Sequence, residues 1–336
     1  MRVLSLASLL LVILLVSLSA YLRLAHSGIG CADWPACYGE IGSGADVNDE
    51  RGSDPAEPAP LRAADAYRKL VDESGRSLAW ATPLYRLVAS VLGLLVVALF
   101  FTALRRKRQR LLSAMLLGLT VYLAVLGIRS GSLHDPAVVM GNLAGGFCML
   151  GLLGWLVFSS GVRGQPPRRV AVVTAAAGLL LCAQILLGGL TSANFAATSC
   201  QTLPDCHGGW WPGPALTVAL DLTRKHEVTA EGQAVGGEER IAIHRAHRRG
   251  AAAVLLVAIL AAGMAYQANA RFRPVALLVI TLAAAEFLVG VASVVSDLPI
   301  ALAVSHNWFA GLLLLALLKL LALSTGKSTG HVTPAQ

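Results

Sequence analysis

Long uninterrupted runs of apolar residues constrain the fold of this chain more than any other feature of its sequence. A helix needs about 20 apolar residues to cross the hydrocarbon layer of a bilayer. Eight such runs occur, at about 3–22, 84–104, 111–128, 137–158, 170–190, 249–268, 274–295 and 300–323. Because backbone polar groups find no water inside a bilayer, these runs predict eight transmembrane helices and an all-α fold. The sixth helix is expected to begin earlier than its apolar run, near Glu239.

The composition agrees with a multi-pass membrane protein. Of the 336 residues, 56% are hydrophobic and only 14% are charged, with a mean hydropathy of +0.66. A soluble protein of this length is more polar. The net charge of +8 comes from short basic clusters between the apolar runs, not from a basic stripe with interleaved aromatic residues. We therefore expect a lipid bilayer as partner and no nucleic acid.

Basic clusters alternate along the chain with connections that lack them. They lie at 105–110, 163–169 and 271–273. Because Lys and Arg are retained on the cytoplasmic side of a membrane, these connections and both termini are predicted to be cytoplasmic. The long connections at about 23–82 and 191–240, which hold four of the cysteines, are then outside. This arrangement suits a bacterial inner membrane.

The chain carries the same succession of features twice, which predicts a tandem repeat. After the first helix of each half comes a Cys-x5-Cys loop, Cys31–Cys37 and then Cys200–Cys206. The second helix of each half opens with an aromatic residue followed by arginine, Tyr85-Arg86 and then His244-Arg245. Each half is therefore expected to form one four-helix bundle.

Positions inside the helices also match. Gln184-Ile-Leu-Leu-Gly188 resembles Glu286-Phe-Leu-Val-Gly290 and Leu123-Ala-Val-Leu-Gly127, and Asn142 in the fourth helix of the first half corresponds to His306 in that of the second. Glu286 fits either a neutral hydrogen-bonding group or a proton relay, because an isolated charge at that depth is costly.

The repeat divides the chain into residues 1–165 and residues 166–336. The first apolar run, with Arg2 before it and small residues at 17–20, also fits a cleaved signal peptide. Because the repeat requires a first helix in each half, we expect this run to be retained.

Two histidines lie at matching depths, which is the strongest indication of a site. His244 and His306 are each expected near the outer end of a helix that enters from outside. Ionisable residues inside a membrane are rare and often functional. Two imidazoles on facing helices suit a six-coordinate haem iron, whereas zinc would require a third or fourth ligand. His247, one turn beyond His244, is either an alternative ligand in place of His244 or a neighbour of the ligand.

Arginines accompany these positions at the outer end, where basic residues are otherwise rare. They are Arg245, Arg248 and Arg249 in the second half, and Arg86 and Arg129 in the first. Arginine binds carboxylates well, so haem propionates are the expected partners. The alternative is that each side chain only extends to the membrane surface.

The two Cys-x5-Cys loops are expected in an oxidising compartment, where disulfides persist. The spacing favours Cys31–Cys37 and Cys200–Cys206 disulfides over zinc binding. Each pair is either a structural link or a reducible functional pair.

With these residues in view, the chain resembles the haem A synthase family of cytochrome oxidase assembly proteins. The resemblance covers nearly the whole chain and is carried by 23–37, 187–194, 200–206, 243–245 and 306–307. It implies oxidation of the methyl group of haem O to the formyl group of haem A. It also implies a haem b in the second half with His244 and His306 as axial ligands, and Cys31 and Cys37 as an outer redox pair.

The same resemblance implies further partners. They are haem O as the substrate in the first half, haem O synthase as its source and an electron donor that the resemblance does not identify. It leaves open whether the protein forms a homo-oligomer.

The first half departs from the family pattern. Where the family has Glu-x-x-His-Arg, this chain has Thr82-Pro-Leu-Tyr85-Arg86, and Asn142 replaces the histidine of the fourth helix. Tyrosine can bind haem iron. We therefore expect Tyr85, Arg86 and Asn142, with Cys31 and Cys37, to form an altered catalytic site. The competing hypotheses are a non-catalytic assembly factor and an electron carrier, each retaining only the second haem.

Overall fold

The computed structural model describes residues 1–26, 80–129, 136–159, 168–200, 202–222 and 237–325. Within these ranges eight helices are long and apolar enough to cross a membrane, as predicted. They are α1 (Arg2–His26), α3 (Ala81–Arg106), α4 (Arg110–Arg129), α5 (Pro136–Phe158), α6 (Arg168–Ala193), α8 (Glu238–Ala268), α9 (Arg273–Val295) and α10 (Ile300–Ser324). The short α7 (Ala215–Ala219) and the 3-10 turn η1 (Ala270–Phe272) lie in connections.

Local sequence accounts for several helix ends. Pro136 begins α5, Pro274 occupies the first turn of α9 and Pro299 immediately precedes α10. Proline is tolerated there because the first N–H groups of a helix have no helical acceptor. At the other end of α3, Lys107 adopts a left-handed conformation (φ 54°) and donates its backbone N–H to the last turn. The chain thereby reverses directly into α4.

Leucine and valine side chains cover much of the outer surface of the helices. Leu94, Leu179 and Leu256 are each about two-thirds exposed or more. Such a surface is unfavourable in water and matches the hydrocarbon of a bilayer. The protein is therefore a multi-pass membrane protein.

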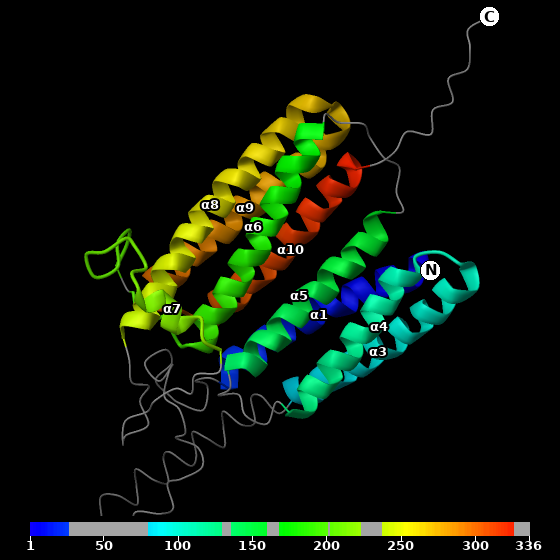
Figure 1. Cartoon of the computed structure of the whole chain (residues 1–336), viewed down its shortest axis with the longest axis horizontal. Helices are drawn as coiled ribbons and strands as arrows, with labels where there is room; N and C mark the ends of the chain where they lie inside the picture. The colour runs from blue at the N-terminus through cyan, green and yellow to red at the C-terminus, as the bar shows by residue number, and fades with distance from the viewer. Residues whose placement is uncertain (27–79, 130–135, 160–167, 201, 223–236, 326–336) are drawn as a thin grey trace, which may run out of the picture.

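The helices of each half pack in the same cyclic order. In the first half α1 contacts α3, α3 contacts α4, α4 contacts α5 and α5 contacts α1. In the second half the order is α6, α8, α9, α10 and back to α6 (Figure 1). The second and fourth helices of each half therefore face each other across a bundle. A duplication predicts this shared order.

The two halves meet along α10, which packs on α1 and α5, and along the contact between α5 and α6. The inner side of α10 is the most buried part of the molecule, with Leu313, Leu317 and Leu320 at most 1% exposed. Gly154 on α5 lets the two helices approach closely, because a Cβ there would collide with Leu315.

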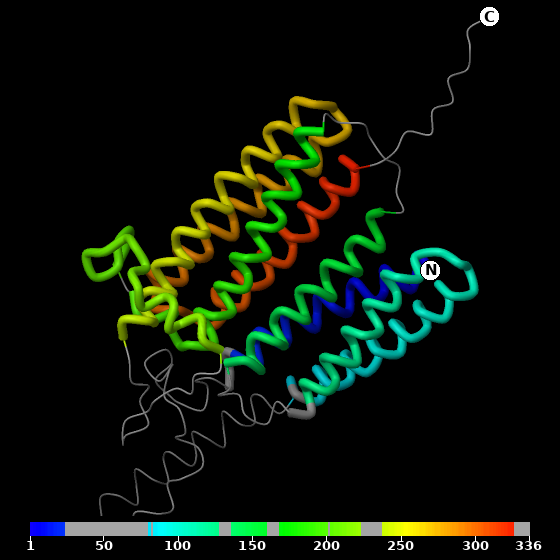
Figure 2. The backbone as a smooth tube through the Cα atoms, viewed as in Figure 1, coloured from blue at the N-terminus to red at the C-terminus, as the bar shows by residue number. Residues whose placement is uncertain are grey.

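The two ends of the molecule differ in their connections. The N-terminus, the α3–α4 turn, the α8–α9 turn and the end of α10 gather at one end (Figure 2). The described basic residues Arg105 to Arg108, Arg110, Arg168, Arg169, Arg271 and Arg273 belong to the connections and helix ends found there. The described part of the loop between α6 and α8, which contains α7, lies at the opposite end (Figure 1).

Candidate functional site

A cavity of about 510 Å³ lies among the four helices of the second half and is also bordered by Arg23 of α1 and by Leu143 and Phe147 of α5. Its walls are mainly apolar and come from all four helices, for example Leu181, Ala251, Phe287 and Leu313. Its polar lining includes His244, His247 and His306, and its rim includes residues of the α6–α8 loop. An apolar cavity with a few convergent polar groups is typical of a cofactor site.

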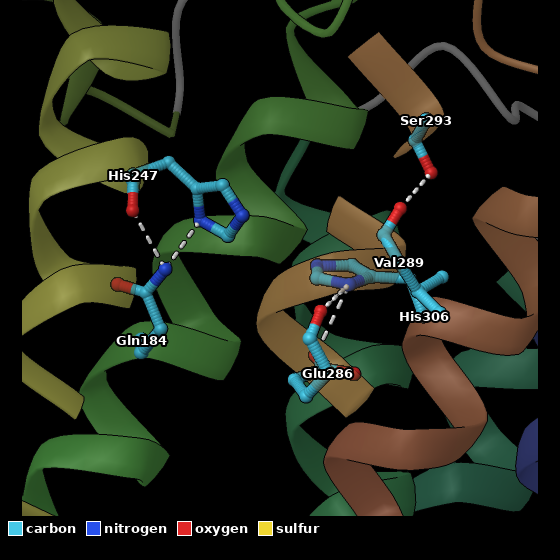
Figure 3. A network of polar contacts seen from close by, with 6 residues as sticks. All are labelled: Gln184, His247, Glu286, Val289, Ser293 and His306. Carbon is cyan, nitrogen blue, oxygen red and sulfur yellow. Dashed lines mark hydrogen bonds and ion pairs between the residues drawn. The ribbon is translucent and has the colours of Figure 1, made fainter. Parts of the chain in front are cut away.

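His247 and His306 face each other in this cavity. The centroids of their rings are 6.1 Å apart and the ring planes are inclined at 79°. In each ring, the nitrogen without a dashed line lies on the side toward the other ring (Figure 3). His247 comes from α8 and His306 from α10, the two helices that are opposite each other in the bundle.

His244, which the sequence suggested as the partner of His306, has a different environment. It lies one turn earlier on α8, only 4% exposed. Its Nε2 accepts a hydrogen bond from Nε of Arg248 at 3.3 Å. Because that lone pair is engaged within α8, His244 is less suited than His247 to bind a metal through Nε2.

Each of the facing rings rests on a glycine and a polar side chain of a neighbouring helix. Gln184 and Gly188 of α6 lie beside His247, while Glu286 and Gly290 of α9 lie beside His306. A Cβ at Gly188 would be 3.0 Å from Cε1 of His247, and one at Gly290 would be 3.1 Å from Cε1 of His306. Glycine thus allows both rings to lie close to the helix backbone.

The three arginines of α8 bind the loop above the cavity. Arg248 donates to the carbonyl oxygens of Thr202 at 2.6 Å and Cys200 at 2.5 Å. Arg245 donates to the carbonyl oxygen of Cys206 at 2.5 Å, and it also reaches that of Trp211. The guanidinium groups expected to meet propionates therefore make their contacts with loop carbonyls.

Arg249 joins the same network through two neighbouring tryptophans of the loop. It donates to the carbonyl oxygen of Trp210 at 3.0 Å, and its Cζ lies 3.4 Å from the ring centroid of Trp211. This cation–π contact adds to the attachment of the loop.

Cys200 and Cys206 form the predicted disulfide. The segment that it closes contributes Leu203, Pro204 and Cys206 to the cavity wall. Two main-chain hydrogen bonds between Cys206 and Gly209 close a turn directly after the disulfide. The disulfide loop and the arginines beneath it together cover the outer side of the cavity.

The predicted residues of the first half are described only in part. Tyr85 of α3 is half-buried and packs on the main core, Arg86 is exposed and Asn142 of α5 is half-buried. Tyr85 and Asn142 thus belong to the two helices that are opposite each other in the first bundle. Cys31 and Cys37, and the side chains of Thr82 and Arg129, lie outside the described residues.

The role of His247 had a sequence signal of its own. If His247 is aligned with Tyr85, the following arginine matches and so does the alanine four residues on, Ala251 with Ala89. If His244 is aligned with Tyr85, the arginine matches but the alanine does not. With the His247 alignment the facing positions are His247 and His306 in one half, and Tyr85 and Asn142 in the other.

The donor set limits the kind of metal site. Within the part of the chain that the structure describes, no three His, Cys, Asp or Glu side chains gather as metal ligands. Two imidazoles across an apolar cavity suit a metal whose remaining ligands come from a macrocycle. Glu286 lies next to His306 but contacts Nδ1, at 3.3 Å, and not the free side of the ring.

The chain is similar to known proteins over most of its length. Residues 2–318 match the COX15-CtaA family model, described as cytochrome oxidase assembly protein. The chain is 32% identical over 318 residues to a haem A synthase of Shewanella oneidensis, covering 91% of each protein. A haem A synthase of Rhizorhabdus wittichii is 32% identical over 152 residues, which are 45% of this chain and 40% of that protein. The chain therefore belongs to the COX15-CtaA family of cytochrome oxidase assembly proteins.

Proposed function

We propose that this protein is a haem A synthase, which oxidises the methyl group of haem O to the formyl group of haem A for cytochrome oxidase. The family match and the Shewanella relative over 91% of the chain support this activity. The observation that carries the proposal is the pair His247 and His306, whose rings face each other across the cavity of the second half.

The geometry of this pair fits a haem iron. Metal–imidazole bonds are about 2 Å long, so a metal shared by two rings places their centroids about 6 Å apart. The observed separation is 6.1 Å. In this proposal His247 and His306 would hold a haem b through their Nε2 atoms, and His247 takes the place first expected for His244. When bound, the haem supplies one-electron redox chemistry.

The protein contributes orientation and exclusion of water. The two histidines would hold the iron between α8 and α10, and the apolar side chains that line the cavity would surround the macrocycle. The arginine network holds the disulfide loop over the outer side. Arg245 and Arg248 border the cavity as well, so each can turn a remaining N–H toward a propionate.

The first half is the proposed substrate side. Tyr85 and Asn142 occupy the positions that correspond to His247 and His306, so haem O is expected between α3 and α5. Tyr85 would face the iron of the substrate, Arg86 and Arg129 would bind its propionates, and Cys31 and Cys37 would form the outer redox pair. Haem O synthase and an electron donor are the proposed partners.

We also propose that the basic end of the bundle is cytoplasmic. The described Arg and Lys residues of the connections gather at the end where the N-terminus lies (Figure 2). By the positive-inside rule this end faces the cytoplasm, and the disulfide loop faces outside.

The proposed activity is tested by incubating the purified protein with haem O, oxygen and a reductant. Haem A formation, followed by the mass of the extracted porphyrin, is the expected result. Tyr85→Phe should lower the conversion at least about tenfold and leave the haem of the second half bound. A protein that holds its low-spin haem and forms no haem A would contradict the proposal.

A further inference from the structure

The two facing histidines are supported by the same local pattern on two different helices. On α6, Gln184 is followed four residues later by Gly188, and on α9, Glu286 is followed four residues later by Gly290. Residues four apart lie on the same face of a helix. Each pattern therefore presents one polar side chain and one glycine to the ring of a histidine.

His306 is held through Nδ1. This nitrogen lies 3.2 Å from the carbonyl oxygen of Glu286 and 3.3 Å from Oε1 of the same residue. A carbonyl oxygen can only accept, so the hydrogen bond requires the proton of the neutral ring on Nδ1. The lone pair of Nε2 then remains free and faces His247 (Figure 3).

His247 is held at the same ring position by a side-chain amide. Nε2 of Gln184 lies 3.0 Å from Nδ1 of His247 and donates to the main-chain carbonyl oxygen of His247 at 2.8 Å. The Gln184 amide thus bridges the ring of His247 and the main-chain carbonyl of the same histidine, which restricts rotation of the ring. In this arrangement Nδ1 accepts a hydrogen bond from the amide. For Nε2 to bind a metal, the ring proton must lie on Nδ1 and the amide must turn its oxygen to it, which exchanges the bond to the main-chain carbonyl for a bond from the ring.

The first half lacks this pattern together with the histidines. Leu123 is the residue that corresponds to Glu286, and Asn142 is the one that corresponds to His306. Leu123 packs on α5 at Gly145, where a Cβ would collide with it. The half with the histidine has a polar residue, Glu286, at this position. The half without the histidine has an apolar residue, Leu123, at the corresponding position.

We propose that Gln184 and Glu286 are positioning residues that hold Nδ1 of His247 and His306, so that both Nε2 atoms point to one metal centre. The inference rests on the proposed haem site and adds the residues that orient its ligands. Such partners fix the ring and raise the basicity of the ligating nitrogen, and their loss costs about 10- to 100-fold in metal affinity.

The test compares Gln184→Leu, Glu286→Leu and Glu286→Gln with the wild-type protein. Haem per chain, the low-spin absorption and EPR signals, and the reduction potential are measured on the purified proteins. Gln184→Leu should weaken haem binding about 10- to 100-fold and raise the high-spin fraction. Glu286→Leu should weaken haem binding less than Gln184→Leu does, because the main-chain acceptor of His306 remains. Glu286→Gln should weaken it least.

A control on α6 separates this role from packing. Thr174→Val also removes a buried polar group from that helix, away from the cavity, and should leave the spectra unchanged.

Wild-type spectra in Gln184→Leu would overturn the inference while leaving the haem site intact. If Gln184→Leu binds no haem, Gln184→Glu decides, because a carboxylate can accept the Nδ1 proton. Restored low-spin haem supports the inference, and haem-free Gln184→Glu with wild-type helix content overturns it. A wild-type protein without low-spin haem would instead contradict the proposed function.

Discussion

At the scale of single residues, the arginines of α8 have a role that their position alone does not reveal. Arg248 contacts the carbonyl oxygens of Cys200, Thr202 and Asp205, and also Nε2 of His244. A charged donor shared among several carbonyls replaces hydrogen bonds that the loop would otherwise make with water. Arg248 therefore links the disulfide loop to the helix that carries His247.

Loss of this link should loosen the loop. In Arg248→Gln, hydrogen bonds to a charged donor worth about 1.5–3 kcal/mol are lost, so amide exchange in residues 202–211 should rise about 10- to 100-fold. Hydrogen exchange with mass spectrometry measures this directly. Arg168→Gln, at the exposed start of α6, serves as the control. Equal protection of the loop in both variants would contradict the assignment.

The site was only partly predictable at this scale. The Cys200–Cys206 disulfide followed from residue type and spacing. Residue type and depth also singled out His306, which lines the cavity. His244 and His247 are three residues apart, so they differ in direction by about 60° around the helix. The depth of a residue does not show which direction faces α10. The carbonyl partners of the arginines belong to a loop whose fold depends on contacts distant in sequence.

At the scale of elements, the disulfide loop covers the cavity that lies among α6, α8, α9 and α10 and is bordered by α1 and α5. Its residues Leu203 and Pro204 form part of the wall, and arginines attach it from below. The cover therefore depends on a covalent link and on a set of hydrogen bonds.

Removal of the covalent link should make the cavity more accessible. In Cys200→Ser with Cys206→Ser, the closed loop is lost and the unfolded loop gains conformational entropy. We expect the haem of the second half to leave at least about tenfold faster, as a loss near 1.4 kcal/mol would produce. Transfer of haem to an excess of a haem-scavenging protein measures the rate. An unchanged rate would show that the arginines suffice to hold the loop.

The helices themselves were largely predictable. Apolar runs of bilayer length have one favourable solution, so all eight predicted spans appear, with α8 beginning at Glu238. The packing order needed the structure, because each helix is apolar on most of its surface. Periodicity then does not distinguish the side facing lipid from the side facing another helix.

At the scale of the whole molecule, the charge distribution along the bundle predicts its orientation. The described basic residues of the connections lie at one end and the disulfide loop at the other (Figure 1). A membrane-impermeant thiol reagent tests this in intact cells. Trp211→Cys should be labelled from outside, and Lys107→Cys only after the cells are opened. The reverse labelling would contradict the proposed topology, and the parent protein controls for Cys148 and Cys182.

The central claim is that His247 and His306, and not His244, hold one metal centre between α8 and α10. The most direct measurement is the low-spin EPR and absorption signal of the purified protein in matched alanine variants. His247→Ala and His306→Ala should each abolish the signal, since each removes one axial ligand. His244→Ala should keep it, because Nε2 of His244 is bound to Arg248. Loss of the signal in His244→Ala, with its retention in His247→Ala, would contradict the account.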